Sequence, residues 1–203
     1  MTQESPRKRR AGVLLFERFE TLDACGPMEM FGTLPGDFEL LTVARESGPV
    51  ASVHGVRVYA DYGFADCPPL DILLVPGGIG SRKELKDPAV LDWLRAQYAA
   101  VELMTSVCTG ALLLAAAGIL DGKRATSNKR VFDEALALSG KVMWIRHARW
   151  VEDGNLVTSS GVSAGMDMAL AVIERLLGSE KAEFVAQNAE YLWNRDPDND
   201  PFA

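Results

Sequence analysis

Three short stretches of the chain hold residue types that can act together on a small electrophile. In the first, SVCTG, Cys108 and Thr109 stand between an apolar run and a run of alanines and leucines. The second is TLDACGP at 21–27, which contains Asp23, and the third is PGG at 76–78. A thiolate is a nucleophile, a carboxyl group can take and return its proton, and glycine N–H groups can approach an anion. The pattern favours nucleophilic catalysis by Cys108.

Alternating strand and helix patterns indicate how these stretches are held. Short apolar runs of strand length are separated by segments with apolar residues at helical spacing. The expected elements are strands at 11–16, 38–44, 71–78, 102–107 and 142–145, hairpins at 50–60 and 150–158, and helices at 22–34, 87–99, 109–117, 128–138, 163–177 and 179–193. This alternation predicts an α/β sandwich with a mainly parallel sheet and right-handed crossovers. Ligands of such sheets bind beyond the carboxyl ends of the strands, where all three stretches are expected to lie.

Cys108 stands where the strand at 102–107 is expected to turn into the helix at 109–117. A residue in such a sharp turn projects its side chain outward, and the small neighbours Thr109 and Gly110 permit the turn. The helix N-terminus favours the thiolate form of the cysteine. An inert, packed cysteine is the alternative, which this strand-turn-helix context disfavours.

Asp23 is the candidate proton partner of that thiol. Neither of the two histidines, His54 and His147, stands at a recognisable catalytic spacing, so a Cys-His pair is disfavoured. A carboxyl group beside a thiolate in a dry pocket tends to share one proton with it. A plain N-cap is the alternative for Asp23, because it lies at the head of the helix at 22–34, in which Pro27 is tolerable only in the first turn.

The glycines at the end of the strand at 71–78 complete the expected site. We expect the backbone N–H groups of Gly78 and Thr109 to stabilise an anion at the attacked atom. Gly77 and Ile79 are expected to line the substrate pocket beside them. The site therefore combines residues from three separate segments of the chain.

Length and composition limit the kind of protein. The 203 residues suffice for one domain with its own core, and we expect a single domain with flexible tails at 1–9 and 195–203. A net charge of -7 argues against nucleic-acid binding, and no apolar run is long enough to span a membrane. Three cysteines without a CxxC pair disfavour disulfides and zinc, so we expect a reducing, cytoplasmic setting and no metal.

With these residues in hand, the sequence resembles the DJ-1/PfpI superfamily. The matching segments are TLDACGP, LDILLVPGG, TSVCTGALLLAAAGILDGKRATS and ARWVEDGNLVTSSGVSAGMDMAL, in this order between positions 11 and 177. Within the superfamily it is most similar to the isocyanide hydratase branch and to the class I glutamine-amidotransferase-like domains attached to AraC-type regulators. The resemblance implies a flavodoxin-like three-layer sandwich with a nucleophile elbow, usually a homodimer, that works without a cofactor.

Carried over residue by residue, the resemblance implies Cys108 as the nucleophile, Asp23 as its acid partner and Thr109 as the residue after the nucleophile. It also implies that Val162, in the GVSAG turn, lies close to the thiol. Thr109 stands where the protease-like members have His, which argues against a peptidase. The residues after AT at 125–126 are Ser, Asn and Lys, where the hydratase branch tends to continue with Thr-His-Trp, and this departure bears on the substrate.

The expected function is cysteine-dependent hydration of an isocyanide, or of a similar small electrophile, to an N-formyl amide. Two alternatives stay open. One is a non-catalytic sensor of a small molecule or of redox state, and the other is glyoxalase or deglycase-type thiol chemistry. The expected partners are a small electrophilic substrate and a second copy of the chain, with neither nucleic acid nor a membrane.

Overall fold

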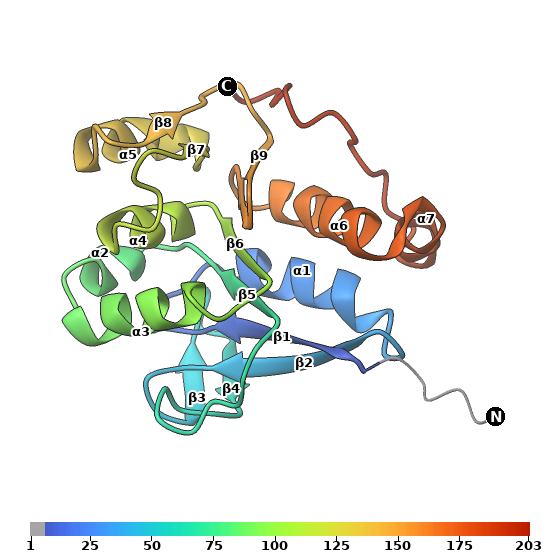
Figure 1. The fold of residues 1–203 in the computed structure, drawn as a ribbon, viewed down its shortest axis with the longest axis horizontal. Coiled ribbons are helices and arrows are strands. Elements are labelled where there is room, and N and C mark those ends of the chain that lie inside the picture. Colours follow the sequence, from blue (N-terminus) through green and yellow to red (C-terminus); the bar gives the residue numbers. More distant parts are fainter. Residues whose placement is uncertain (1–6) are drawn as a thin grey trace.

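A computed structural model describes residues 7–203 and has a central sheet between two layers of helices (Figure 1). The strands of this sheet are β1 Arg9–Leu14, β2 Phe38–Val43, β5 Ile72–Val75, β6 Leu103–Val107, β9 Trp150–Asp153 and β10 Leu156–Ser159. They lie in the order β2-β1-β5-β6-β10-β9, and all neighbours run parallel except β9, which is antiparallel to β10. The predicted α/β sandwich with a mainly parallel sheet is confirmed.

Helices cover both faces of the sheet. They are α1 Thr21–Gly32, α2 Ser81–Glu84, α3 Pro88–Tyr98, α4 Gly110–Ala116, α5 Phe132–Leu138, α6 Ala164–Leu177 and α7 Ser179–Asn188, with a 3-10 turn, η1, at Lys129–Val131. α1, α6 and α7 lie on one side of the sheet, and α2, α3 and α4 lie on the other (Figure 1). Two smaller sheets are formed by β3 Gly48–Ala51 with β4 Arg57–Ala60 and by β7 Arg124–Ala125 with β8 Met143–Trp144. Within residues 7–203, no helix is long and apolar enough to cross a membrane.

The double cover explains the continuous apolar runs of the central strands. Every residue of β5 and of β6 is buried. A strand with helices on both faces has no solvent side, so β5 is an unbroken apolar run, and in β6 even the small polar residues Thr105 and Ser106 are buried. At the carboxyl ends of β1, β5 and β6 the chain continues toward α1, α2 and α4. PGG and Cys108 lie where β5 and β6 end, and TLDACGP forms the first turns of α1, so all three stretches lie at this edge of the sheet.

The predicted elements differ from the structure in a few places. Pro27 lies in the interior of α1 and not in its first turn, so the C=O of Asp23 lacks the usual donor four residues later. α7 ends at Asn188, earlier than predicted, because Glu190 takes a φ of 49°, a left-handed conformation that a helix cannot continue through. The short α2 and β7 were not predicted, since elements of that length show no periodicity.

The expectation of flexible tails does not match the described ends of the chain. Arg9, assigned to the N-terminal tail, opens β1, and its Nε lies 2.8 Å from Glu102 Oε2. Residues 1–6 of that tail lie outside the described residues. At the other end Asp200 is only 4% exposed, and its N–H donates to His147 O at 2.8 Å. The buried side-chain carboxylate of Asp200 therefore holds the C-terminal segment against the body of the protein.

Candidate active site

Cys108 forms a sharp turn between β6 and α4. Its φ is 58°, in the left-handed region that residues other than glycine rarely adopt. Its N–H donates to Ser160 O at 3.0 Å, and its C=O accepts a hydrogen bond from Ser127 Oγ at 2.9 Å. These two bonds hold a strained conformation that presents the sulfur at the carboxyl edge of the sheet. The turn expected from the sequence is present.

Two glycines make room for this turn. A Cβ at Gly77 would lie 2.5 Å from Thr109 N and 2.9 Å from the Cβ of Cys108. A Cβ at Gly110 would lie 2.1 Å from Val75 O. Side-chain carbons do not approach other atoms so closely, because the repulsion between them is too strong. The absence of side chains at these two positions therefore lets the end of β5 pack directly on the turn.

Asp23 reaches the turn from the start of α1 and is fully buried. Its Oδ2 accepts the N–H of Gly77 at 2.9 Å. The thiol of Cys108 and the N–H of Val162 both interact with the carboxyl group, favour its charged form and so lower its pKa. Within residues 7–203, Oδ1 of Asp23 is buried and has no hydrogen-bond partner.

Burial dominates the charge state of this pair. It raises the pKa of Asp23 to about 7, against the opposing effect of the Gly77 N–H. Burial, followed by the charge of Asp23, raises the pKa of the Cys108 thiol to about 12, although Asn128 and the Thr109 N–H favour the thiolate. The N–H of Thr109 at the start of α4 favours the thiolate, as expected, but burial outweighs this effect. Because Asp23 ionises first and its charge then opposes ionisation of the thiol, the pair holds one proton between these two pKa values.

The N–H of Gly78 is not free to bind an anion. It donates to Thr109 Oγ1 at 3.0 Å, and Ser81 Oγ lies 3.1 Å from the same hydroxyl oxygen. The predicted role of Gly78 is therefore corrected: it anchors the side chain of Thr109. The backbone N–H of Thr109, the other predicted donor, faces the sulfur of Cys108.

Asn128 is a site residue that the sequence analysis missed. Its Nδ2 donates to Cys108 Sγ at 3.0 Å, and its Oδ1 accepts the N–H of Arg130 at 2.9 Å. The second bond fixes the orientation of the amide, because only the NH2 group is then left to face the sulfur. One feature of the sequence could have indicated Asn128. After AT at 125–126 the chain continues with Ser, Asn and Lys, which places an amide at 128 where the hydratase branch tends to have His.

Asn128→Ala is expected to slow alkylation of Cys108 by iodoacetamide about tenfold, since a hydrogen bond to an ionised group contributes about 1.5–3 kcal/mol. Its loss raises the pKa of the thiol further and leaves less thiolate to react. The rate is measured by mass spectrometry of the Cys108 peptide. Asn155→Ala, in the β9–β10 turn, is the matched control with an unchanged rate. An unchanged rate in Asn128→Ala would show that this amide does not stabilise the thiolate.

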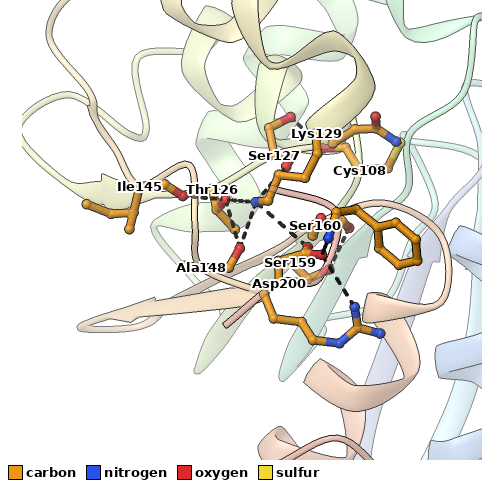
Figure 2. A network of polar contacts seen from close by, with 12 residues as sticks. Cys108, Thr126, Ser127, Lys129, Ile145, Ala148, Ser159, Ser160 and Asp200 are labelled. Carbon is orange, nitrogen blue, oxygen red and sulfur yellow. Dashed lines mark hydrogen bonds and ion pairs between the residues drawn. The ribbon is translucent and has the colours of Figure 1, made fainter. Parts of the chain in front are cut away.

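Lys129, next to Asn128, connects this loop to the C-terminal segment (Figure 2). Its buried Nζ donates to Thr126 Oγ1 at 2.6 Å and to Ala148 O at 2.7 Å. Asp200 Oδ2 lies 3.9 Å away as its counter-ion. Burial lowers the pKa of Lys129 to about 8, an effect that Asp200 opposes. The C-terminal segment therefore supports the loop that carries Asn128.

A small open cavity of about 160 Å³ gives access to the sulfur. We call it the Cys108 cavity; its wall is formed by Glu20, Gly78, Ile79, Arg82, Cys108, Thr109, Asn128, Arg130 and Val131. Ile79 lies in this wall as expected. Gly77 and Val162, also expected in the substrate pocket, do not line this cavity; their N–H groups interact with Asp23. A cavity of about 150 Å³ can hold one benzene ring, so the space suits a small ligand.

The other cysteines and the histidines lie outside the Cys108 cavity. Cys25 is half-buried and lines a separate groove on α1 together with Met28. His54 is exposed, and its Nδ1 lies 2.9 Å from Thr21 Oγ1. Within the described part of the chain, neither His54 nor His147 lines the cavity, which leaves a carboxyl group as the titratable partner of the thiol.

Several known proteins are similar to this chain in sequence and in fold. The sequence model of the DJ-1/PfpI family matches residues 9–175. The chain is 39% identical over 180 residues to isonitrile hydratase of Pseudomonas putida, covering 89% of this chain and 77% of that protein. It is 30% identical over 180 residues to the Parkinson disease protein 7 homolog of Danio rerio, covering 86% of this chain and 93% of that protein. The crystal structure of a THiJ/PfpI family protein from Pseudomonas syringae matches with a TM-score of 0.84 and 31% identity, covering 99% of this chain and 83% of that one. The chain belongs to the DJ-1/PfpI family.

Proposed function

We propose that the protein is a cysteine-dependent hydratase, a lyase that adds water to an isocyanide or a similarly small electrophile and releases an N-formyl amide. The observation that carries this proposal is the buried pair of Cys108 and Asp23, which shares a proton on a strained turn beside a small cavity. The identity to isonitrile hydratase supports the choice of substrate class. The proposal includes action without a metal or an organic cofactor.

In the proposed reaction, the sulfur of Cys108 attacks the terminal carbon of R–N≡C while its proton passes to Asp23. Asp23 then returns this proton to the same carbon, which gives the thioimidate R–N=CH–S–Cys. Water adds across the C=N bond, with its oxygen on the carbon and one proton on the nitrogen. Collapse of this adduct breaks the C–S bond, returns the hydroxyl proton to the sulfur and releases R–NH–CHO. The sum is R–N≡C plus water, with no oxidation or reduction, so no redox cofactor is needed.

Turnover of an aryl isocyanide, followed by the absorbance of the formamide and by mass spectrometry of the intact protein, tests the proposal. We expect formamide together with a transient adduct on Cys108. The Cys25→Ser/Cys67→Ser double variant should behave like the parent protein, because neither thiol lines the Cys108 cavity. Absence of formamide would refute the hydratase. A stable adduct or a reversible oxidation at Cys108 without turnover would favour a sensor, and lactate from methylglyoxal would favour glyoxalase chemistry.

The rate is expected to depend on the protonation of Asp23. Below its pKa of about 7 the carboxyl group already holds a proton and cannot accept one from the thiol, so kcat/KM should fall about tenfold per pH unit. At about pH 5 this gives roughly one hundredth of the rate at about pH 8. The pH profile of the parent protein should therefore show one rising limb, which disappears in the residual activity of Asp23→Asn. A flat parent profile over this range would mean that the carboxyl group does not take the proton.

A further inference from the structure

A second and larger cavity lies at the carboxyl ends of β1 and β2 and has a volume of about 320 Å³. We call it the Glu84 cavity. It shares no lining residue with the Cys108 cavity, and α2 lies between the two, with Arg82 in one wall and Glu84 in the other. The edge beyond the carboxyl ends of the strands is where open α/β sheets bind ligands. The position and size of the cavity are those of a binding site.

Glu84 is a buried acid without a counter-ion. It is only 7% exposed, and it is one of the residues that line the cavity. Within residues 7–203, its carboxylate takes part in no hydrogen bond or ion pair. Two cationic residues also line the cavity: Arg45 is already paired with Asp87, and Lys83 is exposed and forms no ion pair with Glu84. A carboxylate in a cavity wall that has no partner within the chain can pair with a cation that enters the cavity.

The remaining walls of the Glu84 cavity are apolar and partly aromatic. Leu14 and Phe16 come from the end of β1, and Val90 comes from α3. Phe64 forms another wall and is held by stacking on Trp93 with a distance of 4.5 Å between ring centroids. Aromatic faces attract cations, and apolar walls bind hydrocarbon. The combination suits a ligand with one positive charge on an apolar body.

We propose that the Glu84 cavity binds a small organic ammonium ion, whose charged nitrogen pairs with Glu84 and whose apolar body packs against Phe16, Phe64 and Val90. The exposed acids Glu17 and Glu46 also line the cavity and, together with Glu84, outnumber the unpaired Lys83, so the lining is net negative and favours entry of a cation. A volume of about 320 Å³ exceeds the space of one benzene ring, so a ring with a short ammonium arm fits.

Calorimetric titration of the full chain with 2-phenylethylammonium tests this proposal, with 2-phenylethanol as the neutral analogue of the same shape. The ammonium ion is expected to bind at least about tenfold more tightly than the alcohol, because only the ion can pair with Glu84. Glu84→Gln should remove this preference by weakening the ammonium ion about tenfold while leaving the alcohol unchanged. Equal affinities of the two probes, or no binding of either at millimolar concentration, would overturn the proposal.

Two further variants keep the test decisive. Ala44→Leu adds volume to the wall of the Glu84 cavity without touching the acid, so it should weaken both probes even if Glu84→Gln fails to fold. Glu20→Gln removes the carboxylate that lines the Cys108 cavity and should leave the affinity unchanged. Loss of ammonium binding in Glu20→Gln would place the ligand in the other cavity and overturn the proposal. Since binding requires no turnover, failure of this inference and failure of the hydratase proposal are distinguishable.

Discussion

Asp23→Asn is expected to lower kcat/KM for isocyanide hydration about a thousandfold, because general acid–base catalysis contributes about 10²–10⁴-fold and an amide can neither accept nor return the thiol proton. The same substitution should stabilise the protein. A carboxyl group whose pKa rises from 3.8 to about 7 on folding costs up to about 4 kcal/mol of stability at a pH above both values. The amide avoids that cost, while its NH2 group needs partners that the carboxylate did not, so we expect a net gain of about 2 kcal/mol.

The sign of this stability effect depends on pH. The unfolded chain ionises Asp23 near pH 3.8 and the folded protein only near pH 7, so folding loses stability as the pH rises through this window. The melting temperature of Asp23→Asn should therefore exceed that of the parent by about 4–8 °C at about pH 8 and fall below it by a similar amount at about pH 4, where the parent no longer bears the ionisation cost and the amide still lacks partners. Asp92→Asn, on the exposed side of α3, should change neither activity nor stability. Full activity in Asp23→Asn, or a stability difference independent of pH, would contradict the assignment.

Asp200→Ala is expected to destabilise the protein by about 2–4 kcal/mol, because removal of one partner from a buried ion pair leaves the other charge uncompensated. Asp200 lies 3.9 Å from Lys129 Nζ and 3.8 Å from Arg149 Nη1, and the side chains of all three residues are almost completely buried. Arg149 keeps Asp167 as a partner, but Lys129 has no second carboxylate among its contacts in the described residues. Lys129 can lose its proton instead, since its pKa is already lowered to about 8, and this limits the cost.

Thermal unfolding measures this effect, with an expected fall in melting temperature of roughly 5–12 °C for a chain of this length. Asp198→Ala is the matched control, because this acid lies two residues earlier and is exposed. The control should leave the melting temperature within about 1 °C of the parent value. Equal melting temperatures for the two variants would show that the C-terminal segment does not support the body of the protein.

The sequence by itself determined the layered fold and the place of Cys108. A strand that is buried on both faces consists of consecutive apolar or small residues. ILLV at 72–75 and LMTSV at 103–107 therefore indicate central strands, even when the strands beside them in the sheet are unknown. The ends of helices and the turns of hairpins likewise depend on residues that are adjacent in the chain. Asp87 caps α3 by accepting the N–H of Ala89 at 3.0 Å, and the turn at Asp153-Gly154 joins β9 to β10. The elbow follows from such signals, because a strand, a small-residue turn and a helix are adjacent in the chain.

Only the tertiary structure decided which polar groups meet around the thiol. Asn128 lies 20 residues from Cys108 and donates to its sulfur, while the N–H of Gly78 is taken by Thr109. Asp200 arrives from the far end of the chain. Such contacts join loops that come together only when the whole sheet is packed. The spacing of residues in the sequence does not indicate which loops will meet. The pKa values have the same origin, because they depend mainly on how deeply each group is buried, which is a property of the assembled core and not of neighbouring residues.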